Sequence, residues 1–457
     1  MRTLARYTSL QLRCASLLLL IATASCGSWR RVGDDDRTGS SSETLTRLFN
    51  IQAYYQSLGR LAAGEPLPFV GSIAFARGAG DSTIALIGLS LENRSLSFQR
   101  EGNGFVARYR VDLTLQGQGR APISVSRDEL IRVATFQETQ RAEESILFQQ
   151  TFGLEPGSYQ VTAALRDPAT GSTSRAEVSA EAPRFGTGST SSPILVYQAR
   201  GRAAASDTLS LVLNPRGSIG YGSDTLLAYI EGYGFTGPTR VPIEMRTETD
   251  SVIFRDSLAF RGGQPVESQV LKLRPDSLAL GALTLAIGEG SERREVAAVV
   301  SFSGAWVVTN YDEMLDLLRY FGRDRMLDSI RDATADERPA LWRAFWRETD
   351  PDKSTTENEA LNTYFSRLAV ANQRFRGEGV AGWRTDRGEV YVTVGEPDET
   401  FETSPGQMGG RVLRWNYINL RMSLLFHDET GFGRYRLVPS SRAEFERTIT
   451  RLRRTDQ

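Results

Sequence analysis

The period of the hydrophobic pattern is the feature that most constrains how this chain folds. Between residues 67 and 303, short runs alternate apolar and polar side chains and are separated by Gly, Asn, Asp and Pro. A period of two with such breaks is typical of short antiparallel strands. After Trp306 the apolar residues recur with a period of 3.6, which predicts helices. At 457 residues the chain exceeds one ordinary domain. The change of period therefore predicts a multidomain protein, with a β-rich part followed by an α+β domain.

The β-rich part is predicted to hold two tandem immunoglobulin-like β-sandwiches, at residues 67–182 and 190–303. A linker rich in Gly, Ser, Thr and Pro, at 181–193, separates them. A Pro-Gly turn precedes Tyr159, which begins a strand where a corner tyrosine can bond back to the chain. The plainer predicted strands are 83–91, 105–115, 145–152 and 159–165 in the first sandwich, and 209–213, 224–230, 251–259 and 266–273 in the second.

The end of the second sandwich, at 280–285 and 296–302, repeats the pattern that ends the first. This repetition indicates a diverged duplication. Neither sandwich shows a cluster of catalytic residue types, so we expect a spacer or a docking surface.

The C-terminal domain, 308–457, is predicted to contain helices, an antiparallel meander and a final helix. Apolar faces at 311–321, 341–346 and 361–375 predict the helices. Asp336 is the predicted cap of the second, and Thr356 with Glu359 forms a predicted capping box for the third. Ser441 and Glu444 form a similar box for the final helix. The predicted strands are 389–394, 413–417, 422–426 and 435–437.

The first 26 residues are predicted to be a secretion signal. Three arginines precede a short apolar run, which is too short to cross a membrane as a helix. Small residues before Cys26, followed by Gly27, resemble a bacterial lipoprotein processing site, although Thr23 stands where that site usually has Leu. The alternative is an ordinary cleavage site with a chance cysteine. The only other cysteine, Cys14, lies within the signal, so a lipidated Cys26 also explains the lone thiol.

The predicted anchor sets the expected location. Lipid chains on Cys26 would hold the protein on a membrane surface, and Gly27, rather than Asp, favours the outer membrane. Residues 27–66 would then supply a polar tether and a short helix, predicted at 44–62.

Composition excludes several other classes of function. The net charge of −1 disfavours a nucleic-acid binder. His427 is the only histidine, which excludes a site with several histidine ligands. Residues 350–354 resemble the start of a calcium loop, but Thr355 stands where that loop needs Gly and Leu361 where it needs Glu. No metal or cofactor is therefore predicted.

The run Gly382-Trp383-Arg384-Thr385-Asp386-Arg387-Gly388 resembles the signature of the GWxTD-domain family of exported bacterial proteins. The resemblance covers roughly residues 311–437, including the Thr356–Glu359 segment and the Ala371–Phe375 segment. It implies a cell-envelope location and brings no established reaction with it.

Two interpretations of the signature remain open. In the first it is a folding element, in which Gly382 permits close approach, Trp383 is buried, and Thr385 and Asp386 fix a turn. Arg387 would pair with Asp386 or another carboxylate. In the second, some of these side chains line a groove that binds a peptide, a glycan or a protein. Its residues would be Trp383, Asp386, Arg387, Glu396 and Asp398, although the acidic turn that holds the last two also fits a solvated face.

The two interpretations lead to different functions. The first predicts a lipid-anchored, non-enzymatic envelope protein that presents the C-terminal domain to a protein partner. The second predicts a unit that binds envelope polymers or a carboxylate-based hydrolase, with Asp386 facing Asp398 or Glu396 as an acid–base pair.

Overall fold

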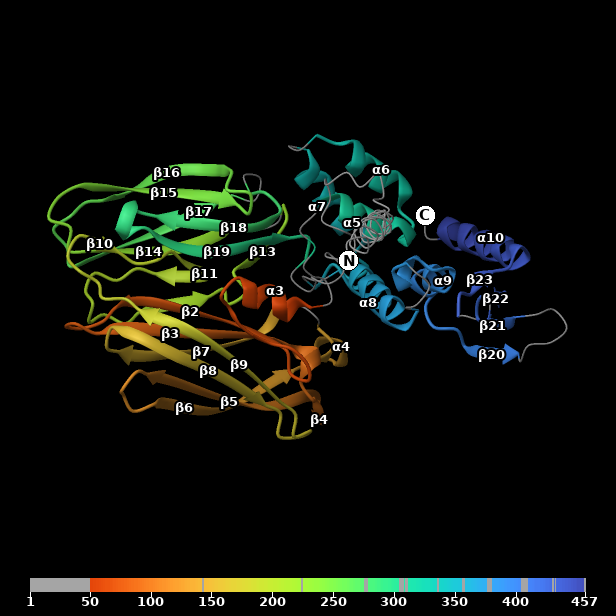
Figure 1. The fold of residues 1–457 in the computed structure, drawn as a ribbon, viewed down its shortest axis with the longest axis horizontal. Helices are drawn as coiled ribbons and strands as arrows, with labels where there is room; N and C mark the ends of the chain where they lie inside the picture. Colours follow the sequence, from red (N-terminus) through yellow and green to blue (C-terminus); the bar gives the residue numbers. More distant parts are fainter. Residues whose placement is uncertain are drawn as a thin grey trace, which may run out of the picture. The chain divides into compact units, whose positions relative to one another are not determined.

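The computed structural model describes residues 50–455, with gaps at 142–143, 223–224, 275–277, 304–307, 309–310, 335–336, 356–357, 376–379, 404–409, 430 and 432. Strands dominate up to Ser301, and helices with one small sheet follow (Figure 1). The β-rich part, the helices of the C-terminal part and the final helix are as predicted. Cys26, the signal and the tether lie outside the described residues, as do the predicted caps Asp336 and Thr356.

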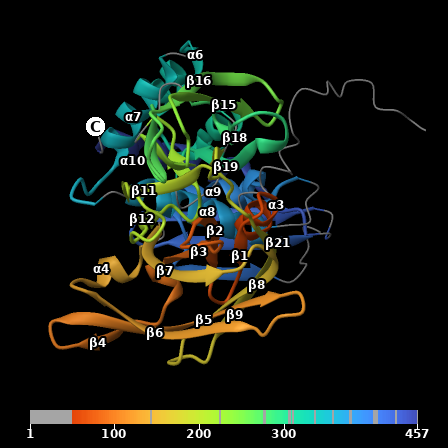
Figure 2. The ribbon, with the colours of Figure 1, turned by 90° about the vertical axis from the view of Figure 1, so that its left-hand side faces the viewer.

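The first β region, residues 61–182, consists of two antiparallel sheets that enclose one core (Figure 2). Leu89, Val111 and Leu165 of that core are completely buried. One sheet holds β1 (Leu61–Ala63), β2 (Phe69–Arg77), β3 (Thr83–Glu92) and β7 (Glu144–Leu154). The other holds β4 (Gln99–Glu101), β5 (Gly104–Gly117), β6 (Ile123–Val133), β8 (Gly157–Arg166) and β9 (Thr173–Ala182). Two short helices, η1 (Asn93–Ser95) and α4 (Phe136–Thr139), connect them.

The predicted strands of this region are present, and so is the corner tyrosine. The Tyr159 hydroxyl donates to the Glu155 carbonyl oxygen at 2.9 Å. Gly157, with a φ of 140°, begins the strand. This local bond ties the strand to the turn before it, as the Pro-Gly-Ser-Tyr order predicted.

The second β region, up to Ser301, also consists of two sheets. One holds β10 (Ser189–Thr190), β11 (Ile194–Arg200), β12 (Ser210–Leu213), β14 (Leu226–Tyr233) and β17 (Val266–Leu273). The other holds β13 (Ser218–Gly220), β15 (Thr239–Thr247), β16 (Val252–Phe260), β18 (Gly281–Ile287) and β19 (Arg294–Ser301). A short helix, η3 (Gly290–Glu292), connects β18 to β19. β13 pairs with β19 in parallel, whereas the other strand pairs of this region are antiparallel.

Two predictions about the connecting segments are wrong in part. The linker at 181–193 is not free, because Phe185 is buried and β10 pairs with β14. The predicted helix 44–62 is helical only as α3 (Ile51–Ser57), and its first residues lie outside the described part. Gly59 adopts a φ of 74°, which ends the helix, and Leu61 pairs with Gly71 in a sheet instead.

The C-terminal part begins with α5 (Tyr311–Leu317), η4 (Leu318–Tyr320), α6 (Asp324–Asp332), α7 (Arg338–Thr349) and α8 (Glu359–Arg374). The signature follows as η5 (Gly382–Arg384) and α9 (Asp386–Val394). The chain then forms the antiparallel sheet β20 (Glu399–Thr403), β21 (Arg411–Tyr417), β22 (Met422–Asp428) and β23 (Arg436–Leu437), and ends in α10 (Pro439–Thr455). The predicted strand at 389–394 is therefore wrong, because these residues are helical.

The helix starts also differ from prediction. Asn358 caps α8, and its Oδ1 accepts a hydrogen bond from the Leu361 amide at 2.9 Å. The final helix begins at Pro439, before the predicted box of Ser441 and Glu444. These two side chains instead accept hydrogen bonds from backbone amides of β22. Their acceptors thus attach α10 to the sheet.

One continuous hydrophobic core runs from the second β region into the C-terminal part. Phe302, at the end of β19, packs edge-on against Trp342 of α7, with ring centroids 4.7 Å apart. Val308, which lies between Phe302 and Trp342 in the sequence, is completely buried. Among the helices of the described ranges, none is long and apolar enough to cross a membrane.

Candidate functional site

The signature forms a tight turn that starts a helix. The Thr385 hydroxyl donates to the Gly382 carbonyl oxygen at 2.7 Å and accepts from the Gly388 amide at 3.0 Å. Thr385 is thereby the N-cap of α9. The alternating valines of residues 390–394 have a strand propensity, but the cap and the burial of Val390 and Val392 override it.

The two signature glycines allow two backbone segments to touch. A side chain at Gly382 would place its Cβ 2.7 Å from the Asn372 carbonyl oxygen. A Cβ at Gly388 would overlap the Gly382 carbonyl oxygen and approach the Trp383 backbone to 2.7 Å. The close approach predicted for Gly382 is therefore real, and Gly388 requires it as well.

Trp383 belongs to the core. It is 1% exposed and lies edge-on to Tyr320, with ring centroids 6.0 Å apart. The guanidinium groups of Arg319 and Arg384 lie 5.3 and 4.9 Å from its ring centre, and Asp316 pairs with both arginines. The indole Nε1 has no hydrogen-bond partner among the described residues. Trp383 is therefore closed off from any ligand groove.

Asp386 connects the start of α9 to the end of the chain. Its Oδ2 accepts a hydrogen bond from the Leu437 amide at 2.7 Å. Its Oδ1 lies 3.4 Å from guanidinium nitrogens of Arg436 and Arg442. With its side chain 17% exposed, the carboxylate holds α9, β23 and α10 together.

Arg387 packs against aromatic rings. Its guanidinium lies 4.5 Å from the ring centre of Tyr435 and 5.1 Å from that of Phe375. It also donates to the Gly433 carbonyl oxygen at 3.3 Å. Its observed role is cation–π packing against rings of two separate segments.

The acidic candidates Glu396 and Asp398 do not join Asp386 in one site. Glu396 is about half exposed and pairs with Arg374 at 2.6 Å. Asp398 accepts a hydrogen bond from the Ile418 amide at 2.6 Å. Across the described residues, the three carboxylates share no hydrogen-bond or ion-pair partner. Each of the three carboxylates binds a different partner, and the predicted groove and acid–base pair stay predictions.

Two other carboxyl groups do interact, at the start of α8. Burial raises the pKa of Asp350, and the neighbouring Glu359 carboxylate raises that pKa further. Glu359 Oε1 accepts from the Thr355 hydroxyl at 2.7 Å, whereas Oε2 is buried without a donor among the described residues. The sequence indicated this segment only as an incomplete calcium loop.

His427 lies on β22, opposite Val412 of β21 and Arg436 of β23. Within the ranges that the structure describes, no group of three His, Cys, Asp or Glu side chains could hold a metal ion. Cys26 lies outside these ranges, so its lipidation stays a prediction.

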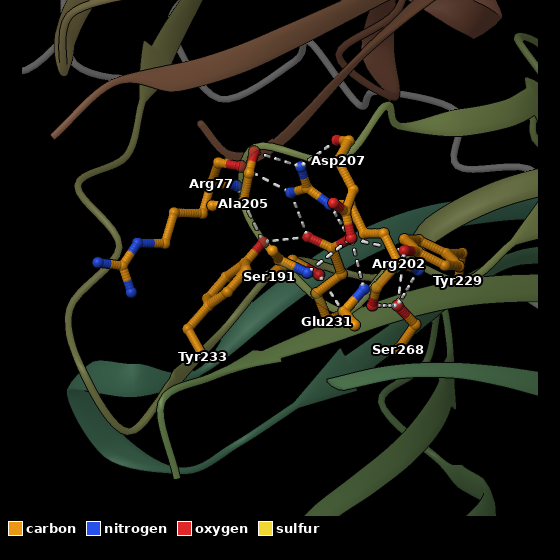
Figure 3. Close-up of polar contacts among 11 residues, drawn as sticks. Arg77, Ser191, Arg202, Ala205, Asp207, Tyr229, Glu231, Tyr233 and Ser268 are labelled. Carbon is orange, nitrogen blue, oxygen red and sulfur yellow. Dashed lines mark hydrogen bonds and ion pairs between the residues drawn. The ribbon is translucent and has the colours of Figure 1, made fainter. Parts of the chain in front are cut away.

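A buried polar network that sequence reasoning missed joins the two β regions (Figure 3). Arg202 and Glu231, with side chains 1% and 0% exposed, form two parallel hydrogen bonds of 2.7 and 2.8 Å. Arg202 also donates to the Arg77 carbonyl oxygen of β2 at 2.6 Å. The hydroxyl groups of Tyr229 and Tyr233 donate to the two Glu231 oxygens.

The network satisfies its own buried charges. Burial by itself lowers the pKa of Arg202. The hydrogen bonds to Glu231 and the negative charge of Glu231 outweigh burial, so the pKa of Arg202 is raised overall. Burial raises the pKa of Tyr229 and Tyr233, and Glu231 raises both further. Every partner is internal, which indicates a structural link rather than a reactive centre. Arg202 lies in the loop after β11 and Glu231 lies within β14, so their sequence positions gave no signal of this pairing.

The fold and the signature define the class of protein: a largely β chain that ends in an α+β domain organised by a capped Gly-Trp-Arg-Thr-Asp turn. Residues 285–431 match the family model described as the GWxTD domain. The chain therefore contains a GWxTD domain. The match begins within β18, earlier than the predicted start near residue 311, in agreement with the continuous core.

Other comparisons add little. No curated protein matches the chain. Solved structures with a match include a trypsin-activated alpha-2-macroglobulin from Escherichia coli, at 11% identity, 55% of this chain, 18% of that chain and a TM-score of 0.16. The calcium-binding domain CBD12 of CALX1.1 matches at 11% identity, over 59% of this chain and 93% of that one, with a TM-score of 0.14. TM-scores this low support no inference about fold or function.

Proposed function

We propose that this chain is a lipid-anchored protein of the cell envelope, held at the outer membrane by Cys26, that presents its GWxTD domain to a protein partner. The two β regions would act as immunoglobulin-like spacers. The signal-like residues 1–26 support export, and the two sheets of each region with the corner Tyr159 support the spacer fold.

One observation carries the non-enzymatic role: the signature residues are used in internal contacts. Trp383 is buried, and Thr385 caps a helix. Asp386 accepts the Leu437 amide, and Arg387 packs on rings. A signature used in this way builds the domain and leaves recognition to its outer surface.

Several contacts favour a rigid presenter. Arg202 and Glu231 link the two β regions, as does a second buried pair of Arg216 and Glu92 at 3.2 Å. The shared core then continues into the helices that precede the signature. Such links would hold the two β regions and the GWxTD domain in a fixed arrangement beyond the tether.

The anchor is tested by a Cys26→Ala variant of the full chain, with Cys14→Ala as the matched control. We expect the wild type and the control to incorporate labelled fatty acid and to stay in the membrane fraction after a salt wash. The Cys26→Ala variant should incorporate none and be released. Retention of the unlabelled variant in the washed membrane would contradict the anchor.

The partner is tested by crosslinking in intact envelopes, followed by capture of the full chain. Exposed apolar side chains of the GWxTD domain include Ile418, which is 63% exposed. We expect Ile418→Asp to reduce a reproducible crosslink, and Val252→Asp, at an exposed position of the second β region, to leave it unchanged. Absence of any reproducible partner for the wild type would refute this role.

A further inference from the structure

A cavity of about 690 Å³ lies between α8 of the GWxTD domain and the edge of the first β region formed by η1 and α4. Its volume falls in the range of small-molecule sites, roughly 300–1,000 Å³. The two walls are close together: the hydrogen bond from Ser354 is the largest cause that lowers the pKa of Asp352, and Gln137 of α4 lies near enough to that carboxyl group to help lower it. The five residues of the predicted signature groove do not line this cavity, so it is a separate candidate.

Nearly all of the lining residues have polar side chains, although their carbon atoms also form part of the wall. Apart from Val370, every lining residue carries a side chain that can form hydrogen bonds. Hydroxyl and amide groups predominate, including Asn362, Thr363 and Ser366 on α8 and Gln137 on α4. Drug-like ligands prefer apolar walls, whereas hydroxyl and amide side chains offer hydrogen-bond donors and acceptors to a ligand with many hydroxyl groups.

The charges of the lining cancel. Three arginines face three acids: Arg94, Arg141 and Arg367 against Glu138, Asp352 and Glu359. Several are already engaged within the wall. Arg94 pairs with Glu92 at 2.7 Å, and Asp352 accepts hydrogen bonds from Ser354. A phosphate or a polyanion would gain little net attraction, which favours a neutral ligand.

The wall on α8 is held in place by the core. Leu361, Tyr364, Phe365 and Leu368 bury the opposite face of this helix. Asn362 and Ser366 are one helical turn apart and lie on the cavity side. Polar groups on a packed helix are pre-organised, which reduces the entropic cost of binding.

We propose that this cavity is a binding site for a neutral saccharide, in which Asn362, Thr363 and Ser366 of α8 and Gln137 of α4 hydrogen-bond sugar hydroxyl groups. In an envelope protein, the corresponding ligand would be a glycan chain. The site does not depend on the anchor at Cys26 or on a protein partner.

The test is a calorimetric titration of the full chain with β-1,4-linked N-acetylglucosamine tetramer and with maltotetraose. We expect saturable binding of at least one of them. Asn362→Ala and Gln137→Ala should each weaken it about 2- to 10-fold, the loss of one hydrogen bond. Ser366→Arg should abolish it by filling the cavity. Gln373→Ala, an exposed amide change on α8 outside the cavity, should leave it unchanged.

The design separates folding from binding, because the altered side chains are not in the core and the variants should keep the wild-type thermal unfolding curve. Failure of both saccharides to bind would overturn the proposal, as would binding that the α8 and α4 variants do not weaken. If inorganic phosphate binds at the same residues more strongly than either saccharide, the proposal that the ligand is neutral is overturned. If the wild type binds a saccharide but gives no reproducible protein crosslink, only the presenter role is contradicted.

Discussion

Replacing Asp386 by alanine tests whether the signature is a folding element. The change removes the acceptor of the Leu437 amide, at 2.7 Å, and the carboxylate that lies 3.4 Å from both Arg436 and Arg442. A hydrogen bond to a charged group contributes about 1.5–3 kcal/mol. The partly exposed ion pairs add less than about 1 kcal/mol. We therefore expect a loss of about 2–3 kcal/mol in the free energy of unfolding of the GWxTD domain.

The assay is urea unfolding followed by tryptophan fluorescence. Four of the six tryptophans lie in the described C-terminal part and give most of the signal: Trp342, Trp346, Trp383 and Trp415. The matched control is Glu396→Ala, which removes an acidic side chain that is 54% exposed and paired with Arg374. We expect the control to cost no more than about 1 kcal/mol.

An Asp386→Asn variant refines the result, because its amide oxygen can still accept from the Leu437 amide. It should retain more of the stability than Asp386→Ala. The reasoning is refuted if Asp386→Ala unfolds at the wild-type urea concentration, or if Glu396→Ala is the more damaging change.

Three further predictions concern other parts of the fold. Gly388→Ala should destabilise the GWxTD domain by about 3 kcal/mol or prevent its folding, measured by the same fluorescence assay, because the new Cβ overlaps backbone atoms. Glu231→Gln should cost about 3–5 kcal/mol, measured by circular dichroism of the β regions, because it leaves the buried Arg202 charge uncompensated. Hydrogen bonds from arginines, chiefly Arg246, lower the pKa of Glu244 to about 2. Its stabilising contribution is therefore complete above its ordinary pKa of 4.5 and is lost as the pH falls towards 2, so Glu244→Gln should flatten the acid dependence of stability in that window.

Each of these has a matched control. Gly186→Ala places a Cβ in open space and should be neutral. Asp81→Asn removes an exposed ion pair with Arg184 and should change stability by less than about 1 kcal/mol. Glu155→Gln, at a position 78% exposed, should leave the acid profile as in the wild type. If a control changes the stability, or its dependence on pH, as much as its test variant does, the mechanism given for that variant is contradicted.

The strands of the β-rich part could be predicted because their signal is local. Alternation, turn residues and the corner Tyr159 all act within a few residues of one another. The helices of the C-terminal part were predictable for the same reason, since the apolar residues of α7 and α8 recur at helical spacing.

The strand predicted at 389–394 failed because tertiary contacts reversed a local preference. Three alternating valines favour a strand, but Thr385 caps the segment and Gly388 lets it pack against the preceding turn. The hydrogen-bond partners of Asp386 and Asp398 could not be predicted for a related reason. These partners, Leu437 and Ile418, are distant in sequence, so spacing alone could not show which backbone amides the two carboxylates bind.

By itself, the sequence determined the family of the C-terminal domain, the order of strands and helices, and the residues that make the signature turn, because these depend on short-range patterns. Only the tertiary structure decided that Trp383 is buried, that Arg202 and Glu231 join the two β regions, and that a polar cavity faces α8. Each of these features depends on which segments, distant in sequence, come into contact. Burial then determines whether a polar or aromatic side chain is available to a ligand or is used in contacts within the protein.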